Sequence, residues 1–307
     1  MTFNKKWPCG VYFFYYHDIS ILDVVPSHIR TSPSRFEEEI HYIKNHFNVT
    51  SFEKGIRLLS EKVKEAYAVI CFDDGFSGAF QNGIPVLEKN QLPAIFFLNG
   101  AFVRQEAVAE AIHVEHINKS WGPEKINEVF PDFDGRASFR KYIKKGSSLS
   151  QFEKLNQLSG EELLAKNIYA NHETISQSNN DLFSIGNHTT NHLWLPNLNL
   201  EDQRTEVSEN FEYLKQFPNY INYLAFPFGS VDSFNDDTLT LVPEFSKNVL
   251  IKATGGINHR REGNLLSIER MGLSDDKPPI HQFIWERVKE TKLHKLAKRV
   301  KNKLASL

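Results

Sequence analysis

The chain has 307 residues, of which 40% are hydrophobic and 24% charged, as in an ordinary globular protein, and this length suffices for one α/β barrel. A net charge of −2 argues against a nucleic-acid partner, and two cysteines build no disulfide framework. No apolar run is long enough to span a bilayer and the first residues lack a signal-peptide core, so we expect a cytoplasmic protein.

Apolar runs alternate with helix-like segments along the chain. Strands are expected at residues 11–16, 48–51, 67–72 and 94–98, and near Phe183, Ile221, Val249 and Leu266. A helix is expected at 35–47, capped by Ser34. A second follows the strand at 48–51 and runs to about residue 59, and a third follows the strand at 67–72 and runs to about residue 90. Residues 19–33 are expected to form a loop. This alternation predicts an α/β fold with a parallel sheet, and the number of strands suits a closed or nearly closed barrel.

Two adjacent carboxylates, Asp73 and Asp74, end the apolar strand at 67–72. Neighbouring side chains on a strand point to opposite faces, unless the chain turns, and Gly75 permits such a turn. Burying two acids is costly unless each has a partner. A metal ion would be the partner of one, and base chemistry the task of the other.

A histidine pair, His188 and His192, follows a second short strand. On a helical turn this spacing places both imidazoles on one face, where they can hold one cation. Two histidines and one aspartate form a three-ligand set with open positions, as in catalytic metal sites. Such a pair is more often two surface histidines, and Asp-Asp-Gly is a common turn, but both motifs here follow buried strands.

Three motifs in this order resemble the polysaccharide deacetylases of carbohydrate esterase family four, the nodulation-type deacetylase homology domain. Residues 71–75, Cys-Phe-Asp-Asp-Gly, match the family's Thr-Phe-Asp-Asp-Gly, and residues 188–192 match His-Ser/Thr-x-x-His. Residues 225–229, Ala-Phe-Pro-Phe-Gly, stand where the family has Arg-x-Pro-Tyr-Gly. The resemblance spans about residues 11–273 and implies a distorted (β/α) barrel with about seven parallel strands.

The resemblance implies removal of an N-acyl group, normally acetyl, from a sugar. Asp74, His188 and His192 would hold one divalent ion, and Asp73 would be the general base. Zinc is the first choice for this ligand set, and cobalt or nickel also fits. The carbohydrate substrate would contact the third motif, at Phe226, Pro227, Phe228 and Gly229.

Two departures from the family concern charge and proton supply. Ala225 replaces the arginine that normally pairs with the base aspartate. Arg270, after a late strand, could supply that charge, although a surface arginine is an equally good interpretation. The family's Leu-x-x-His motif near the C-terminus is missing, since His281 and His294 lack its context.

His17 is the expected general acid in place of the missing motif. It ends the first strand at the rim where the metal should lie, and an ordinary imidazole pKa near 6.5 suits proton exchange at neutral pH. Tyr16-His17-Asp18 also resembles a segment of the poly-N-acetylglucosamine deacetylase branch, whose acid is thought to come from the N-terminal strand. Alternatively, His17 closes the barrel mouth or hydrogen-bonds Asp18.

A helical insertion is expected at residues 101–181, with helices at 105–116, 123–129 and 160–176. Inserted loops at this end of a barrel usually cover the substrate site, which favours a lid, with a structural elaboration or an oligomer contact as alternatives. We do not expect its histidines to be ligands, because ligands must converge; these are His113, His116 and His172. The barrel itself would comprise the rest of residues 1–290.

The last segment, residues 291–307, holds six Lys/Arg and no acid, with apolar residues at helical spacing. It predicts either a basic amphipathic helix on the inner face of an anionic membrane or a terminal helix packed on the barrel. The first fits a lipid-linked substrate. Functionally, we expect a deacetylase of a cell-surface polysaccharide or its precursor. The alternatives are a metal hydrolase of another non-peptide C–N bond, a non-catalytic carbohydrate-binding relative, and a membrane or complex adaptor.

Overall fold

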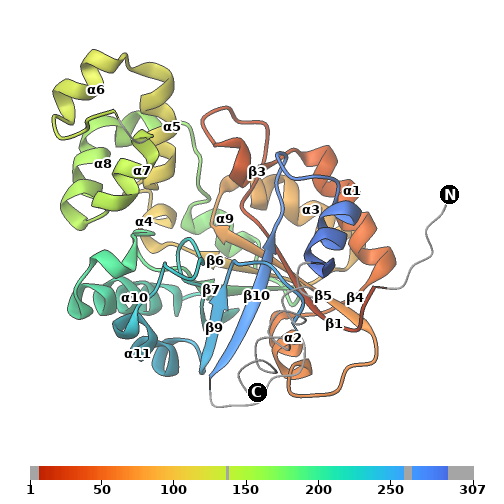
Figure 1. The fold of residues 1–307 in the computed structure, drawn as a ribbon. Helices are drawn as coiled ribbons and strands as arrows, with labels where there is room; N and C mark the ends of the chain where they lie inside the picture. Colours follow the sequence, from red (N-terminus) through yellow and green to blue (C-terminus); the bar gives the residue numbers. More distant parts are fainter. Residues whose placement is uncertain (1–6, 136–137, 259–264, 290–307) are drawn as a thin grey trace, which may run out of the picture.

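The computed structural model describes residues 7–135, 138–258 and 265–289. Its centre is a nearly closed barrel of parallel strands with helices around it, which confirms the predicted fold class (Figure 1). Seven strands form the barrel: β1 (Gly10–Tyr16), β5 (Ala66–Asp74), β6 (Ala94–Leu98), β7 (Phe183–Asn187), β8 (Tyr220–Leu224), β9 (Val249–Lys252) and β10 (Leu266–Gly272).

The strand order is β8-β7-β6-β5-β1-β10-β9, and each neighbouring pair is parallel. An isolated parallel bridge between Ala225 and Ile251 joins the two outer strands and nearly completes the barrel. A short strand, β4 (Asn48–Val49), also pairs with β5. Because all strands run the same way, their C-terminal ends meet at one mouth, where sites of such barrels lie.

The apolar runs form strands that are buried on both faces. In β1, Phe13 packs with Val69 and Cys71 in one cluster, whereas its neighbour Phe14 packs with Ile70 in another. This alternation is the period of a strand covered on one side by the barrel interior and on the other by helices. It explains why the sequence reads as continuous hydrophobic runs.

The helices around the barrel differ from the predictions mainly at their ends. They are α1 (Pro33–His46), α2 (Phe52–Leu58), η2 (Ala79–Gly83), α3 (Ile84–Asn90), α10 (Leu200–Leu214) and α11 (Asp236–Phe245). The predicted cap of α1, Ser34, is wrong: Ser32 occupies the N-cap position, since Pro33 suits the first helical position, and its side chain bonds Asp275 rather than the helix. The expected loop at 19–33 also contains paired strands, β2 (Asp18–Ile19) and β3 (Arg30–Thr31), with the short helix η1 (Ser27–Ile29).

Between β6 and β7 the chain is helical, and α5 to α8 gather beside the barrel mouth (Figure 1). The helices are α4 (Gly100–Val103), α5 (Glu110–Ser120), α6 (Pro123–Val129), α7 (Phe139–Gly146), α8 (Leu149–Leu164) and α9 (His172–Gln177). The predicted α6 is correct. The expected helix at 105–116 starts later, α7 was not predicted, and the expected helix at 160–176 is wrong, because α8 ends at Leu164.

Residues 168–170 explain that break, because they pair with the chain just after β5. The amide of Ser77 donates to the carbonyl of Ile168 at 2.8 Å, and the amide of Ala170 donates to that of Gly75 at 2.9 Å. The Tyr169 ring packs against Phe76 at 4.9 Å between centroids. This end of the helical segment therefore belongs to the packing of the barrel mouth.

The predicted basic helix at 291–307 lies outside the described residues. Within the described ranges, no helix has both the length and the apolar character needed to cross a membrane.

Candidate active site

The two aspartates at the end of β5 both reach one pocket of about 430 Å³. Asp74 and Gly75 have φ of 70° and 79°, so two consecutive left-handed residues turn the chain there. Glycine adopts this region without strain, whereas aspartate is one of the few other residues that visit it. The turn brings together side chains that a straight strand would have sent to opposite faces.

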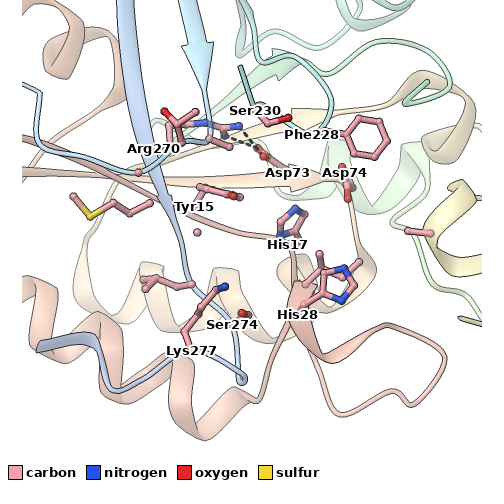
Figure 2. A pocket seen from close by; sticks show the side chains of 18 of the residues that line it. Tyr15, His17, His28, Asp73, Asp74, Phe228, Ser230, Arg270, Ser274 and Lys277 are labelled. Atoms are coloured by element: carbon pink, nitrogen blue, oxygen red, sulfur yellow. Dashed lines mark hydrogen bonds and ion pairs between the residues drawn. The ribbon is translucent and has the colours of Figure 1, made fainter. Parts of the chain in front are cut away.

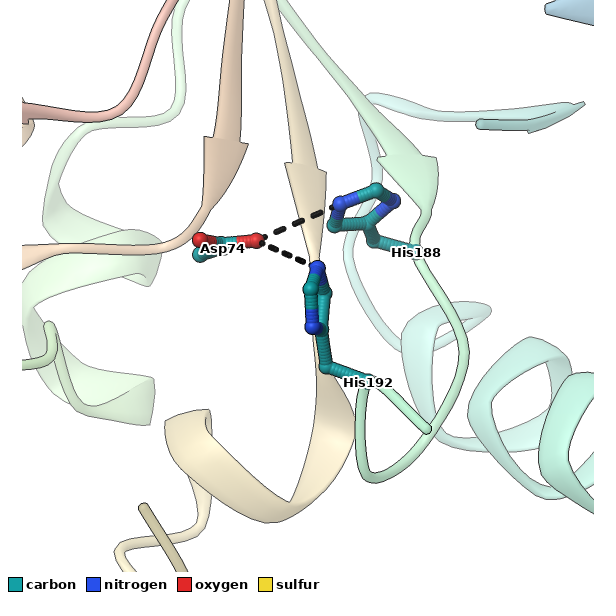
Figure 3. Close-up of side chains that lie close together, drawn as sticks. All are labelled: Asp74, His188 and His192. Atoms are coloured by element: carbon teal, nitrogen blue, oxygen red, sulfur yellow. Dashed lines mark ion pairs between the residues drawn. The ribbon is translucent and has the colours of Figure 1, made fainter. Parts of the chain in front are cut away.

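Three potential metal ligands converge in this pocket (Figure 3). Asp74 Oδ1 lies 3.2 Å from His188 Nε2 and 3.4 Å from His192 Nε2. His188 Nδ1 lies 2.7 Å from the carbonyl oxygen of Ala225, which can only accept, so Nδ1 carries a proton and Nε2, which faces the cluster, is the nitrogen that could bind a metal.

Asp74 Oδ1 is buried and has no hydrogen-bond partner among the described residues. Burial alone would raise the pKa of Asp74, but the neighbouring histidines hold it well below its ordinary value. A buried anionic oxygen facing two imidazole nitrogens is a fitting donor set for a divalent cation.

The loop that carries both histidines is not the helical turn that the sequence predicted. After β7 the chain passes through Thr189 and His192 in the left-handed region, with φ of 68° and 56°. Asn99 holds this loop through hydrogen bonds from its amide nitrogen to the carbonyls of His188 and Thr189. The fixed loop, rather than a helix face, makes the imidazoles converge.

A buried carboxylate, Glu206, fastens the same loop from the other side. Its two oxygens accept from the backbone amide and the side-chain amide of Asn191 at 2.9 and 2.6 Å. Burial raises the pKa of Glu206 to about 7, and the hydrogen bonds from Asn191 oppose this rise. Sequence reasoning missed Glu206 and Asn99. The signal for Asn99 was its position directly after the strand at 94–98.

Arg270 on β10 forms a bidentate ion pair with Asp73, with N–O distances of 2.7 and 2.9 Å. Its side chain is 1% exposed and lies over the ring of Tyr15, with 4.7 Å to the centroid, so it is not a surface arginine. Burial alone would raise the pKa of Asp73, but the Arg270 guanidinium, followed by His188, holds it below its ordinary value. Asp73 is therefore an ionised carboxylate.

His17 lines the same pocket, beside Asp73 and Asp74 (Figure 2). Its Nδ1 is buried without a hydrogen-bond partner among the described residues, and its ring packs edge-on against Tyr15. Burial lowers the pKa of His17, and the two carboxylates oppose that shift. The alternative contact with Asp18 is not made, since Asp18 accepts from Ser20 instead.

The third motif contributes two side chains to the pocket, Phe226 and Phe228. Within the described chain, Pro227 and Gly229 do not line it but shape the turn, since the Gly229 amide donates to the Pro227 carbonyl at 2.7 Å. Gly229 has a φ of 60°, and a Cβ there would lie 2.5 Å from the side chain of Ala253.

The insertion reaches the pocket at the start of α5, with Ala109 and Ala111, and through α7, which the sequence did not predict. Its Lys144 Nζ lies 3.8 Å from the ring centroid of Trp194, two residues beyond the candidate ligand His192. The Trp194 amide donates to Ser147 Oγ, and the Asn197 side chain donates to the carbonyls of residues 145 and 147. These contacts fasten the end of α7 to the loop that carries His192.

His28, on the short helix η1, also lines the pocket, and the sequence did not single it out. The other histidines lie elsewhere. His113 is buried among the insertion helices, where Nδ1 hydrogen-bonds Ser159 Oγ at 2.7 Å. His116, His172 and His281 do not line the pocket in the part of the chain that the structure describes, and His294 lies outside that part.

Comparisons with known proteins agree with this geometry. The family model described as polysaccharide deacetylase matches residues 60–132 and 162–246, so the unmatched stretch between them contains α7. A search among curated proteins gave no match.

Several solved structures share the fold. The deacetylase PplD of Streptococcus pyogenes, solved in complex with acetate, is 18% identical with a TM-score of 0.54, covering 93% of this chain and 99% of its own. IcaB of Ammonifex degensii is 14% identical with a TM-score of 0.57, covering 88% and 94%. The BpsB deacetylase domain of Bordetella bronchiseptica is 13% identical with a TM-score of 0.52, covering 86% and 96%. With the family match on both halves of the site, the chain belongs to the polysaccharide deacetylase family.

Proposed function

We propose that the protein is a metal-dependent hydrolase that removes an N-acetyl group from a sugar in a cell-surface polysaccharide or its precursor. One observation carries the proposal. An ionised carboxylate, Asp73, lies in the same pocket as a convergent metal-ligand set, with its Oδ2 4.0 Å from His188 Nε2, and pairs with Arg270. Family membership supplies the sugar substrate and the deacetylation.

Asp74, His188 and His192 would hold the ion, with zinc as the first choice and cobalt or nickel fitting the same ligands. A divalent ion there supplies a Lewis acid that polarises the acyl oxygen and makes a water molecule more acidic. The backbone carbonyl of Ala225 orients His188 for this task.

Asp73 would take the proton from the attacking water as general base, since Arg270 keeps its carboxylate ionised and fixes its orientation. The leaving nitrogen must be protonated, because an amine anion is too basic to depart. His17 is the proposed proton donor, because it lines the pocket next to both carboxylates. In the free protein burial favours its neutral form, so the proton that Asp73 takes from the attacking water would have to pass to His17 before His17 gives it to the leaving nitrogen.

A direct test incubates the zinc-loaded protein with an N-acetylated chitooligosaccharide and measures released acetate. The Asp73→Asn variant should keep its zinc but lose on the order of 10²–10⁴-fold in turnover, the usual contribution of a general base. Release of acetate by the variant within a few-fold of wild type would remove Asp73 from the mechanism. A wild type that binds zinc and releases no acetate would instead favour the alternatives, another C–N bond or carbohydrate binding alone.

For location, we propose the cytoplasm, with peripheral contact of residues 291–307 at the inner face of the membrane. The support is the charge of that segment, which holds six Lys/Arg and no acid. Flotation with anionic liposomes should retain the full chain and lose a chain truncated after residue 290. Equal flotation of both would contradict the membrane contact.

A further inference from the structure

The pocket carries more positive charge than the deacetylation chemistry explains. Among the described residues, its acids are Asp73 and Asp74 alone. Asp73 is neutralised by Arg270, and Asp74 faces the proposed ion. Four further cations line the pocket: Arg140, Lys144, Lys277 and Arg287. A neutral N-acetyl sugar requires none of them.

These cations come from separate parts of the chain. Arg140 and Lys144 lie on α7, one turn apart, whereas Lys277 follows β10. Figure 2 shows Lys277 directing its ammonium group into the pocket from the side opposite Asp73. Two unrelated segments thus present like charges to one cavity, which costs repulsion unless an anion lies between them.

Within the described ranges, no ion pair neutralises Arg140, Lys144 or Lys277. Arg140 and Lys277 form no ion pair with any residue of the described chain, and Lys144 is positioned by the rings of Trp194 and Phe228 instead. Asp232 interacts electrostatically with Lys144 without forming an ion pair with it, and Asp232 and Asp276 accept from Ser230 and Ser274 and do not line the pocket within the described ranges. Arg140, Lys144 and Lys277 therefore remain available to a ligand.

We infer that the sugar substrate carries an oxyanion close to the acetylated residue, held between α7 and the segment after β10 by Arg140, Lys144 and Lys277. The inference rests on the proposed function and specifies its substrate. The oxyanion could be a phosphate at the reducing end of the sugar or a carboxylate on the neighbouring sugar, since arginine and lysine bind both.

The test compares three substrates derived from N-acetylglucosamine or its disaccharide, N,N′-diacetylchitobiose. The first is a neutral methyl glycoside, the second carries a phosphate at its reducing end, and the third, N-acetylglucosaminyl-glucuronate, carries a carboxylate on the neighbouring sugar. The zinc-loaded wild type should show a higher kcat/KM for one of the two anionic substrates, and added salt should weaken this preference. Which anionic substrate is preferred distinguishes the phosphate from the carboxylate.

Arg140→Gln and Lys277→Gln should each reduce that preference by about tenfold, as expected for loss of a hydrogen bond to a charged group. Lys141→Gln is the matched control, because Lys141 is an exposed lysine of the same helix that does not line the pocket among the described residues. It should leave the preference unchanged.

The failures of the two proposals can be told apart. Equal turnover of the neutral and anionic substrates would overturn the oxyanion site, and so would equal effects of Lys277→Gln and Lys141→Gln on the preference for the anionic substrate. Neither result would contradict the proposed deacetylase activity. If nothing is turned over, calorimetry with the same compounds decides the matter. Tighter binding of an anionic compound that is lost in Lys277→Gln supports the oxyanion site without the deacetylase, and equal binding overturns it.

Discussion

Arg270 and Asp73 form a bidentate ion pair across the barrel mouth, although β1 lies between the strands that carry them. The guanidinium reaches over the ring of Tyr15 on that intervening strand. The family's arginine would stand at Ala225, so this chain has its positive charge on a different strand, facing the same carboxylate.

Arg270→Gln should therefore cost both stability and activity. It leaves Asp73 buried without its partner, which typically costs about 3–5 kcal/mol in unfolding free energy. Because Arg270 lowers the pKa of Asp73, its removal raises that pKa, and activity that needs the ionised form should disappear at a higher pH as the solution is acidified. Urea unfolding and a pH profile of acetate release measure the two effects.

The matched control for Arg270 is Arg204→Gln, whose exposed pair with Glu244 should contribute less than about 1 kcal/mol. Adding Ala225→Arg to an Arg270→Ala variant recreates the family's arrangement and should recover part of the activity. Wild-type behaviour of Arg270→Gln in both assays would show that the ion pair has no role.

The ligand assignment predicts about one zinc ion per chain. His188→Ala and His192→Ala should each abolish stoichiometric zinc, measured by mass spectrometry after dialysis, and should remove the rise in melting temperature that zinc gives the wild type. His41→Ala is the control, because His41 is an exposed histidine on α1. Full zinc content in both ligand variants would contradict the assignment.

The role of His17 can be tested by changing the leaving group. His17→Ala should lower turnover of an N-acetyl sugar by on the order of 10²-fold or more. Its effect on p-nitrophenyl acetate should be much smaller, because that leaving group departs without a proton. Zinc content should not change. An equal loss on both substrates would mean that His17 positions the substrate or the water rather than supplying a proton.

Glu110 in the insertion predicts a pH dependence of stability. Burial raises the pKa of its carboxyl to about 7, while hydrogen bonds from Gln151 and Ser147 oppose the rise. The pKa of Glu110 is higher in the folded chain than in the unfolded chain, where it is near 4.5, so the protonated carboxyl contributes stability that is fully present below pH 4.5. This contribution disappears as the pH rises through about 7.

Urea unfolding at pH 5 and pH 8 measures that contribution. Between pH 5 and pH 8 the unfolding free energy of the wild type should fall by roughly 2–3 kcal/mol more than that of Glu110→Gln, since about 1.4 kcal/mol accompanies each pKa unit. Glu115→Gln, a half-buried neighbour on the same helix, serves as the control. Identical pH dependence in wild type and Glu110→Gln would contradict the prediction.

The barrel was predictable because its strands are buried on both faces and so appear as apolar runs that end in polar motifs. The position of Arg270 was anticipated only as one of two interpretations, because the sequence does not show that a side chain crosses an intervening strand. The shape of the histidine loop was not predictable: a four-residue spacing fits a helix, and only the φ values at Thr189 and His192 exclude it.

The insertion was the least predictable part, and its errors have tertiary causes. The helical pattern at 160–176 is interrupted because Ile168 and Ala170 pair with the chain after β5. The cations on α7 and after β10 gave no signal, since single lysines and arginines read as solvated surface until the fold brings them together.

The fastening of α7 to the histidine loop has a consequence for local opening. Trp194 and Asn197 are bonded to residues 145 and 147, so the loop cannot swing out without releasing the end of α7. In hydrogen–deuterium exchange the two segments should open as one cooperative unit. An ion held by His192 would then slow hydrogen–deuterium exchange in peptides covering residues 139–147. Exchange in α7, which contributes no metal-binding side chain, would therefore report on metal occupancy.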